Sequence, residues 1–192
     1  MAFYTQAELE ELGFKYLGEN VKVSKLASIY NAKNIEIGDN SRIDDFCVLS
    51  AGEGGISIGR YVHIAIYTSL MGTGRIIMED YTGLSSKCAV YSSNEDYSGK
   101  FMTNPTVPSE YTNVSHAPVT IKKHSLVGVG SIILPGVTIE ECVAVAALSL
   151  VNKSLESGFI YIGQPAKKKM KRSRNCEVLE RELCWNTYAS KG

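Results

Sequence analysis

Between Ile121 and Leu150, apolar residues recur at every sixth position, an interval that fits neither a helix nor a plain strand. A helix repeats near 3.6 residues and a strand at 2, whereas a period of six is typical of triangular coils, with one short strand and one turn per block. The first and fifth residues of each block should point inward and stack into one continuous core. The first residues are Ile121, Val127, Ile133, Ile139 and Val145, and the fifth are Ser125, Ser131, Val137, Val143 and Ser149.

An earlier tract, from Ile37 to Ala89, has the same period. It is interrupted by a glycine-rich segment at residues 52–55 and by a short adjustment at residues 72–77. Cys47 and Cys88 fall on fifth positions, where a small apolar side chain fits the core. We therefore interpret them as reduced cysteines that pack inside the solenoid. Two tracts with one period predict a single solenoid over most of the chain.

The sequence predicts a helix near each end of the chain. Residues 5–12 have Thr5 as an N-cap and Gly13 just past the end, and a helix here would cover the first coil of the stack. Residues 177–188 predict a second helix, which follows a basic run. Its apolar side would be supplied by Val178, Leu179, Leu183 and Trp185.

Residues 91–117 lose the period altogether. This polar stretch contains two prolines and is longer than a loop that only connects two elements of a compact domain. Long loops on a rigid scaffold usually carry function, and its four aromatic residues predict packing against something, such as a neighbouring subunit. The fold class is therefore all-β, a parallel β-helix with a protruding loop. It divides into an N-terminal cap (1–20), a solenoid (21–165), and a basic segment with a C-terminal helix (166–192).

Composition narrows the classes of function. The formal net charge is zero, which gives no general reason to expect nucleic acid or an anionic membrane as a partner. No apolar run reaches the ~20 residues needed to span a bilayer, and the N-terminus has no signal-peptide pattern. The five cysteines show no metal-like spacing. We expect a cytoplasmic protein without a membrane span.

The repeats, the loop and the C-terminal motifs VGVGSIILPGVTI and IGQPAK resemble the hexapeptide-repeat acyltransferases, in particular the bacterial sugar O- and N-acetyltransferases of surface-polysaccharide pathways. The resemblance covers roughly residues 35–172. It implies a left-handed β-helix, a handedness that the spacing itself does not show. It also implies a homotrimer with its active sites between neighbouring stacks. The donor would be acetyl-CoA, without a metal, and the acceptor a sugar or nucleotide sugar, such as an O-antigen (lipopolysaccharide) precursor.

The same resemblance assigns a surface for acyl-CoA along the C-terminal coils. Small residues there let the thin pantetheine arm approach the backbone, although the glycine that usually leads the second block is here Ala146. The basic segment would meet the phosphates. The matching residues are Gly128, Val129, Gly130, Ala146, Ala147, Lys153, Pro165, Lys167 and Lys168.

Acyl transfer requires a proton to leave the acceptor, and histidine is the commonest base. His63 is the sixth residue of its block and should point out of the prism. The equivalent position one coil later is Gly83, which leaves space beside the ring, so His63 is the first candidate for the base. His116, where the loop rejoins the stack, is the second candidate, and His124, near the CoA end, is the third.

One departure from the family concerns the opening of the loop. Galactoside and maltose acetyltransferases carry a Gly-His-Pro segment there, whereas residues 93–97 of this chain contain no histidine. The base is therefore either another histidine or a carboxylate of the loop, Glu95 or Asp96, and a carboxylate base would suit an amine acceptor. N- and O-acylation both stay open. The residues expected to bind the sugar are Asn94, Glu95, Asp96 and Tyr97.

Two other classes of protein share this type of fold. A trimeric zinc carbonic anhydrase needs three converging histidines, but the three histidines here give no pair within one coil. A non-catalytic solenoid that binds or scaffolds usually shows a regular outward array of Thr or Ser, and the outward positions here are irregular. An acyl-CoA enzyme is therefore favoured.

Overall fold

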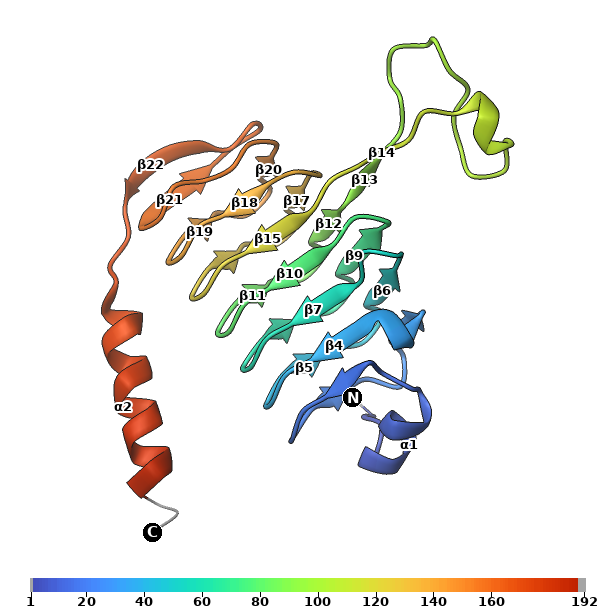
Figure 1. Cartoon of the computed structure of the whole chain (residues 1–192). Helices are drawn as coiled ribbons and strands as arrows, with labels where there is room; N and C mark the ends of the chain where they lie inside the picture. Colours follow the sequence, from blue (N-terminus) through green and yellow to red (C-terminus); the bar gives the residue numbers. More distant parts are fainter. Residues whose placement is uncertain (1, 190–192) are drawn as a thin grey trace.

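The computed structural model describes residues 2–189 and confirms the predicted β-solenoid (Figure 1). Short strands, three to a coil, form three parallel sheets that run along the stack. Sheet 1 contains β1 (Tyr16–Leu17), β4 (Ile35–Ile37), β7 (Ile56–Ile58), β10 (Ile76–Met78), β15 (Val119–Ile121) and β18 (Thr138–Ile139). Sheet 2 contains β2 (Lys22–Val23), β5 (Arg42–Ile43), β8 (His63–Ile64), β11 (Gly83–Leu84), β16 (Leu126–Val127), β19 (Ala144–Val145), β21 (Phe159–Ile162) and β22 (Lys167–Lys171). Sheet 3 contains β3 (Ser28–Tyr30), β6 (Val48–Ala51), β9 (Ser69–Gly72), β12 (Ala89–Tyr91), β17 (Ile132–Ile133) and β20 (Leu150–Val151).

The turns between the sheets form three edges along the prism. Edge 1 joins sheet 1 to sheet 2, edge 2 joins sheet 2 to sheet 3, and edge 3 joins sheet 3 to sheet 1 of the next coil. One strand breaks the parallel order, because β22 turns back and pairs antiparallel with β21. A 3₁₀ turn, η1 (Ala32–Asn34), lies on edge 3 after the first coil.

The interior follows the period of six. Every first and fifth residue named for the C-terminal tract is at most 2% exposed. The buried serines are tolerated because their hydroxyls donate to backbone carbonyls. Ser125 donates to Glu140 of the next coil at 2.7 Å, whereas Ser149 donates to Ala146 of its own coil at 2.8 Å. Cys47 and Cys88 are also buried, and their thiols point at the carbonyls of Ala65 and Gly128.

Both predicted helices are present. Helix α1 (Gln6–Glu11) begins with a capping box between Thr5 and Glu8, and its Leu9 fills the open end of the core. Helix α2 (Asn175–Ala189) runs beside the stack, back toward its N-terminal end (Figure 1). The expected apolar side of α2 stays at least 40% exposed in the single chain at Val178, Leu179, Leu183 and Trp185. No helix of the described residues is long and apolar enough to cross a membrane.

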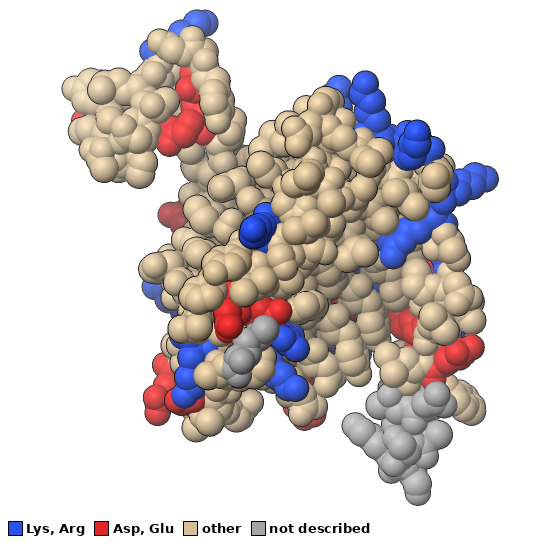
Figure 2. Space-filling model, turned by 180° about the vertical axis from the view of Figure 1, so that it is seen from behind, with Lys and Arg blue, Asp and Glu red and all other residues tan. Residues whose placement is uncertain are grey.

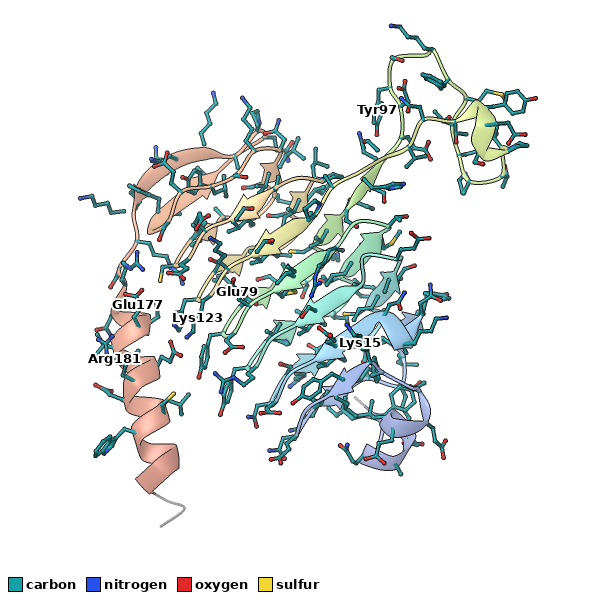
Figure 3. All side chains as sticks on the ribbon, viewed as in Figure 1. Lys15, Glu79, Tyr97, Lys123, Glu177 and Arg181 are labelled. Atoms are coloured by element: carbon teal, nitrogen blue, oxygen red, sulfur yellow. The ribbon has the colours of Figure 1, made fainter. Side chains whose placement is uncertain are left out.

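The loop leaves the stack at edge 3, after β12, and projects far from it (Figure 1). Its neck is a short antiparallel pair, β13 (Ser93–Asn94) with β14 (Ser115–His116), and its tip contains the 3₁₀ turn η2 (Ser109–Tyr111). Tyr97 points away from the coils and is 86% exposed (Figure 3). The loop therefore contacts little of its own chain, which leaves its aromatic side chains available for another.

Candidate active site

The small residues predicted to face acyl-CoA lie in one column on edge 2. The backbone NH of Gly128 donates to the Val145 carbonyl at 2.8 Å, and the NH of Leu148 donates to the Val129 carbonyl at 2.8 Å. The column continues toward the C-terminus, where the NH of Ala166 donates to the Leu150 carbonyl. Members of the column are residues 128–130, 146–147 and 163–166, and the turn at residues 85–86 continues it in the N-terminal direction.

Gly128 has a steric reason to be glycine. A Cβ at this position would lie 2.6 Å from the backbone nitrogen of Ala147 in the next coil. Its absence lets the two coils pack closely and keeps this part of edge 2 flat. A flat strip of backbone is what a thin ligand arm needs in order to lie close to the protein.

The lysines assigned to the same ligand are more dispersed. Lys153 lies on edge 3, after β20, and not in the column. Lys167 and Lys168 lie on the exposed strand β22, where Figure 2 shows basic side chains gathered at one end of the molecule. The ammonium of Lys168 pairs with Glu156 and lies 4.2 Å from the centre of the Phe159 ring, which places it away from the small-residue column.

His63 points outward from sheet 2, as its place in the repeat predicts. Its Nε2 lies 2.9 Å from a carboxylate oxygen of Asp44, which is only 5% exposed, and the other oxygen of Asp44 accepts from Arg42 Nε at 2.6 Å. Gly83 is the register partner of His63 one coil later, as predicted. The repeat did not predict the contact between His63 and Asp44, because this contact joins residues of successive coils.

Of the four predicted sugar-binding residues, Asn94 lies in the loop neck and the other three, residues 95–97, lie just beyond it. His116 Nδ1 lies 2.8 Å from the Ser93 hydroxyl, so the second candidate base belongs to the neck itself. The carboxylate of Asp96 accepts from the NH of Ser98 at 2.7 Å and from the Asn113 amide at 3.0 Å. These hydrogen bonds, with that of the Ser98 hydroxyl the largest cause, lower the pKa of Asp96. Asp96 is thus a fixed, charged acceptor at neutral pH.

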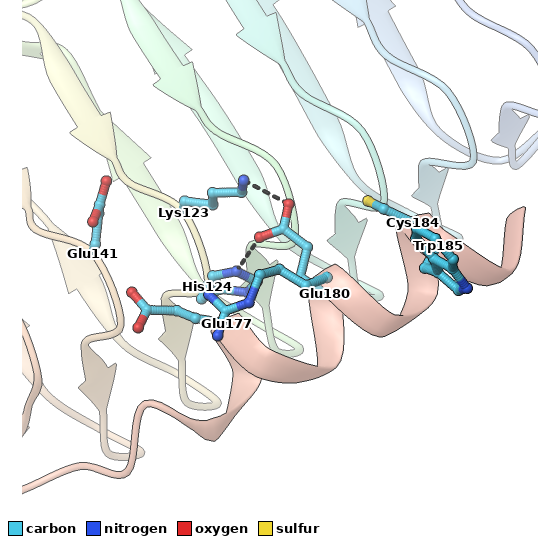
Figure 4. Close-up of a pocket in the computed structure, with 8 residues that line it drawn as sticks. Lys123, His124, Glu141, Glu177, Glu180, Cys184 and Trp185 are labelled. Atoms are coloured by element: carbon cyan, nitrogen blue, oxygen red, sulfur yellow. Dashed lines mark hydrogen bonds and ion pairs between the residues drawn. The ribbon is translucent and has the colours of Figure 1, made fainter. Parts of the chain in front are cut away.

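The contacts of His124 give it a structural role. The sequence predicts an outward side chain near the CoA end, but α2 covers it, and its ring is stacked on Tyr81 in a ladder that continues to Tyr61. Glu180 of α2 binds both His124, at 2.8 Å, and Lys123, at 2.6 Å (Figure 4). Burial raises the pKa of Glu180, but the bonds from Lys123 and His124 outweigh it and lower the pKa overall. His124 therefore helps to fix α2 against edge 1.

Replacing Glu180 by Gln should lower the free energy of unfolding by about 1 kcal/mol near neutral pH, because the charged hydrogen bonds to α2 are lost. The folded-state pKa of Glu180 is depressed, so its contribution is present above the unfolded pKa of about 4.3 and fades as the pH falls through the folded value. Thermal melting should therefore separate wild type and variant near pH 7 and bring them together at strongly acidic pH. Glu182→Gln, on the exposed side of α2, is the control, and a gap of constant size at all pH values would contradict this role.

No group of three or more His, Cys, Asp or Glu side chains suited to a metal ion occurs among the residues that the structure describes. The three histidines lie apart, on β8, in the loop neck and under α2.

Comparisons with known proteins agree with this geometry. No family model matches the chain. Over 180 residues it is 51% identical to the dTDP-4-amino-4,6-dideoxy-D-glucose acyltransferase of Escherichia coli, covering 94% of both chains. AntD, an N-acyltransferase from Bacillus cereus solved with dTDP and coenzyme A, superposes with a TM-score of 0.93 at 46% identity, covering 97% of this chain and 100% of AntD. A maltose O-acetyltransferase from Clostridium difficile shares the fold at 19% identity and a TM-score of 0.58, over 88% of this chain and 75% of that one.

The solenoid of hexapeptide coils, together with a relative that is 51% identical and a CoA-bound structure on which the chain superposes, defines an acyltransferase that uses an acyl thioester of CoA. The chain is an acyl-CoA-dependent sugar acyltransferase. It belongs to the hexapeptide-repeat acyltransferase family, in the group of the dTDP-amino-sugar acyltransferases. This membership sets aside both the carbonic anhydrase and the non-catalytic solenoid.

Proposed function

We propose that this enzyme transfers a short acyl group from acyl-CoA to the 4-amino group of a dTDP-linked 4-amino-4,6-dideoxyhexose. The observation that carries this proposal is the 51% identity, over almost the whole of both chains, to an enzyme named for that sugar. AntD supports the same acceptor, because one of its structures contains dTDP-4-amino-4,6-dideoxyglucose with coenzyme A. The acceptor is then an amine, which favours N-acylation over O-acylation.

A serine–aspartate spacing shared with AntD identifies two residues of this chain as candidates for the reaction. The AntD structures include variants of one serine and of one aspartate that follows it ten residues later. In this chain a single serine has an aspartate ten residues after it, and the pair is Ser86 and Asp96. Ser86 lies on edge 2 directly beside the CoA column, since its carbonyl accepts from the NH of Gly130 at 3.0 Å. We assign Ser86 to the reacting end of acyl-CoA and Asp96 to the amine.

The lowered pKa of Asp96 defines what its carboxylate contributes. A carboxylate of depressed pKa is a weak base, so proton abstraction is not its main contribution. Attack of a neutral amine on the thioester places positive charge on the nitrogen, and a fixed anion stabilises that charge as it forms. Asp96 therefore orients the amine and stabilises the nitrogen after attack, while the Ser86 hydroxyl hydrogen-bonds to the reacting groups.

A homotrimer explains how the two residues meet. Ser86 lies on edge 2, whereas Asp96 lies in the loop beyond edge 3, so one chain holds them at different edges of the prism. Edge 2 also carries exposed apolar side chains, including the stacked Phe46 and Tyr67 and the 65% exposed Leu148. In the proposed trimer these side chains face a neighbouring stack, whose loop brings its Asp96 to Ser86. Size-exclusion chromatography with light scattering tests the oligomeric state.

Ser86→Ala and Asp96→Ala should each reduce kcat/KM by about 10²-fold, the effect expected when one group that stabilises developing charge is removed. CoA affinity should change little in Asp96→Ala, because the loop lies off the CoA column. Ser98→Ala tests whether fixing the carboxylate matters, and Glu110→Gln, an exposed change in the same loop, is the control. Turnover of both variants within a few fold of wild type would remove this pair from the reaction.

The proposed function is tested by mixing the enzyme with acetyl-CoA and a panel of nucleotide sugars while following the free thiol of released CoA. Turnover is expected with dTDP-4-amino-4,6-dideoxyglucose and not with dTDP-glucose, which offers hydroxyls alone. Turnover with the hydroxy sugar and none with the amino sugar would contradict N-acylation. We place this reaction in the cytoplasm, as a step that prepares a surface-polysaccharide precursor such as that of an O-antigen.

A further inference from the structure

Two cysteines meet where helix α2 begins to cover the stack. Cys142 lies in the turn of edge 1 between β18 and β19, and Cys176 is the second residue of α2. Their sulfur atoms lie 3.7 Å apart, in van der Waals contact, although the residues are 34 positions apart in the sequence. Cys142 is the fourth residue of its block, an outward position like that of His124, and it is fully buried outside the core because α2 covers it.

The surroundings fix both partners of this contact. On the side of the stack, the NH of Cys142 donates to the Lys123 carbonyl at 3.0 Å. On the side of the helix, Arg174 donates to the Glu177 carboxylate at 3.1 Å and to the Ser157 hydroxyl at 3.0 Å, so it ties the first turn of α2 to the stack. The thiol of Cys142 also points at Glu177, at 3.7 Å. Two reacting groups that are already held together react far faster than the same groups free in solution.

The two thiols differ in access and in reactivity. Cys142 is fully buried, and burial, followed by its contact with Cys176, raises its pKa to about 12. It therefore holds very little of the nucleophilic thiolate at neutral pH. Cys176 is only partly buried, so a dissolved reagent reaches it first. Edge 1 takes no part in the proposed trimer, which joins edges 2 and 3 of neighbouring copies, so this access persists in the assembly.

We propose that Cys142 and Cys176 form a reversible disulfide that fastens α2 to the solenoid, made by exchange with a low-molecular-weight disulfide such as glutathione disulfide. The thiolate of Cys176 attacks one sulfur of the reagent and displaces the other as a thiolate, which takes up a proton. Cys142 then loses its proton, attacks the sulfur of Cys176 in the mixed disulfide and expels the second reduced thiol. Two electrons pass from the protein to the reagent. Disulfides of this kind in a cytoplasmic protein are transient and sense the redox state.

Incubating the whole protein with glutathione disulfide, without denaturant, tests the proposal. Intact-mass spectrometry should first show a mixed disulfide and then its conversion into a species lighter than the reduced protein by two hydrogen atoms. That conversion should accelerate about tenfold per pH unit below the pKa of Cys142, because its thiolate is the attacking group. The oxidised protein should melt at least about 5 °C higher, since the bond constrains the unfolded chain, and dithiothreitol should reverse the change.

Substitutions separate the two thiols. Cys142→Ser should stop at the mixed disulfide on Cys176, and Cys176→Ser should form no cross-link and show no rise in melting temperature. Cys184→Ser changes another cysteine of α2, one that lines the groove between the helix and edge 1, and it should oxidise like wild type (Figure 4).

A wild-type mixed disulfide that never converts would overturn the proposal, and so would conversion that persists in Cys142→Ser. A cross-link that leaves the melting temperature unchanged would show that the bond does not fasten α2, which would overturn it as well. None of these results depends on which sugar accepts the acyl group.

Discussion

Replacing residues 95–114 by a two-residue Asn-Gly turn should leave a folded solenoid that binds CoA but transfers acyl groups at least about 10²-fold more slowly. The neck permits this change, because Asn94 and Ser115 face each other across an antiparallel pair that Asn-Gly can close. The loop contributes nothing to the core, so unfolding should occur near the wild-type temperature. Activity should fall because the replaced segment carries Asp96 and the rest of the proposed acceptor site.

The matched control shortens only the tip, replacing residues 104–107 by two glycines and keeping both Asp96 and Asn113. Thiol release and CoA calorimetry on the two variants separate loss of the acceptor site from loss of the donor site. A loop-deleted enzyme that retains most of its turnover would place the acceptor somewhere other than the loop.

The second large effect is expected from Gly128→Ala. The new Cβ would lie 2.6 Å from the backbone of Ala147, and backbone atoms inside a stack have little room to yield. The two coils should be forced apart on edge 2, with a loss of about 1–3 kcal/mol in stability. CoA affinity should fall at least about 10-fold, because the flat column no longer lets the pantetheine arm approach.

Gly38→Ala provides the comparison for this variant. Its Cβ would lie 2.6 Å from the backbone of Gly59, so it causes the same kind of clash between coils, but on edge 1. Both variants should melt at lower temperature, and Gly128→Ala alone should lose CoA affinity, as measured by calorimetry. Equal CoA affinity in the two variants would remove the column from the donor site.

The period of six determined most of the fold in advance. Ile64 and Thr68 occupy a first and a fifth position and are both fully buried. Thr5, as an N-cap with a glutamate three residues later, located α1 within a residue. These features depend on neighbours in the sequence, so the sequence alone shows them.

The hydrophobic repeat could not predict contacts between residues of different coils. Asp44 meets His63 because the stack places residues about one coil apart side by side, and α2 covers His124 because the chain doubles back along edge 1. Ser86 was not among the predicted site residues, because its link to Asp96 came from the AntD variants and its contact with Gly130 joins two coils.

The most direct test of the account uses trimers that mix Ser86→Ala and Asp96→Ala chains, co-expressed with different tags and purified by both. If each site combines Ser86 of one copy with Asp96 of the next, every trimer that contains both kinds of chain has one intact site of its three, and the purified mixture should regain about one third of wild-type turnover. Each variant alone should stay near its reduced rate. A mixture no more active than the separate variants would contradict a site shared between copies.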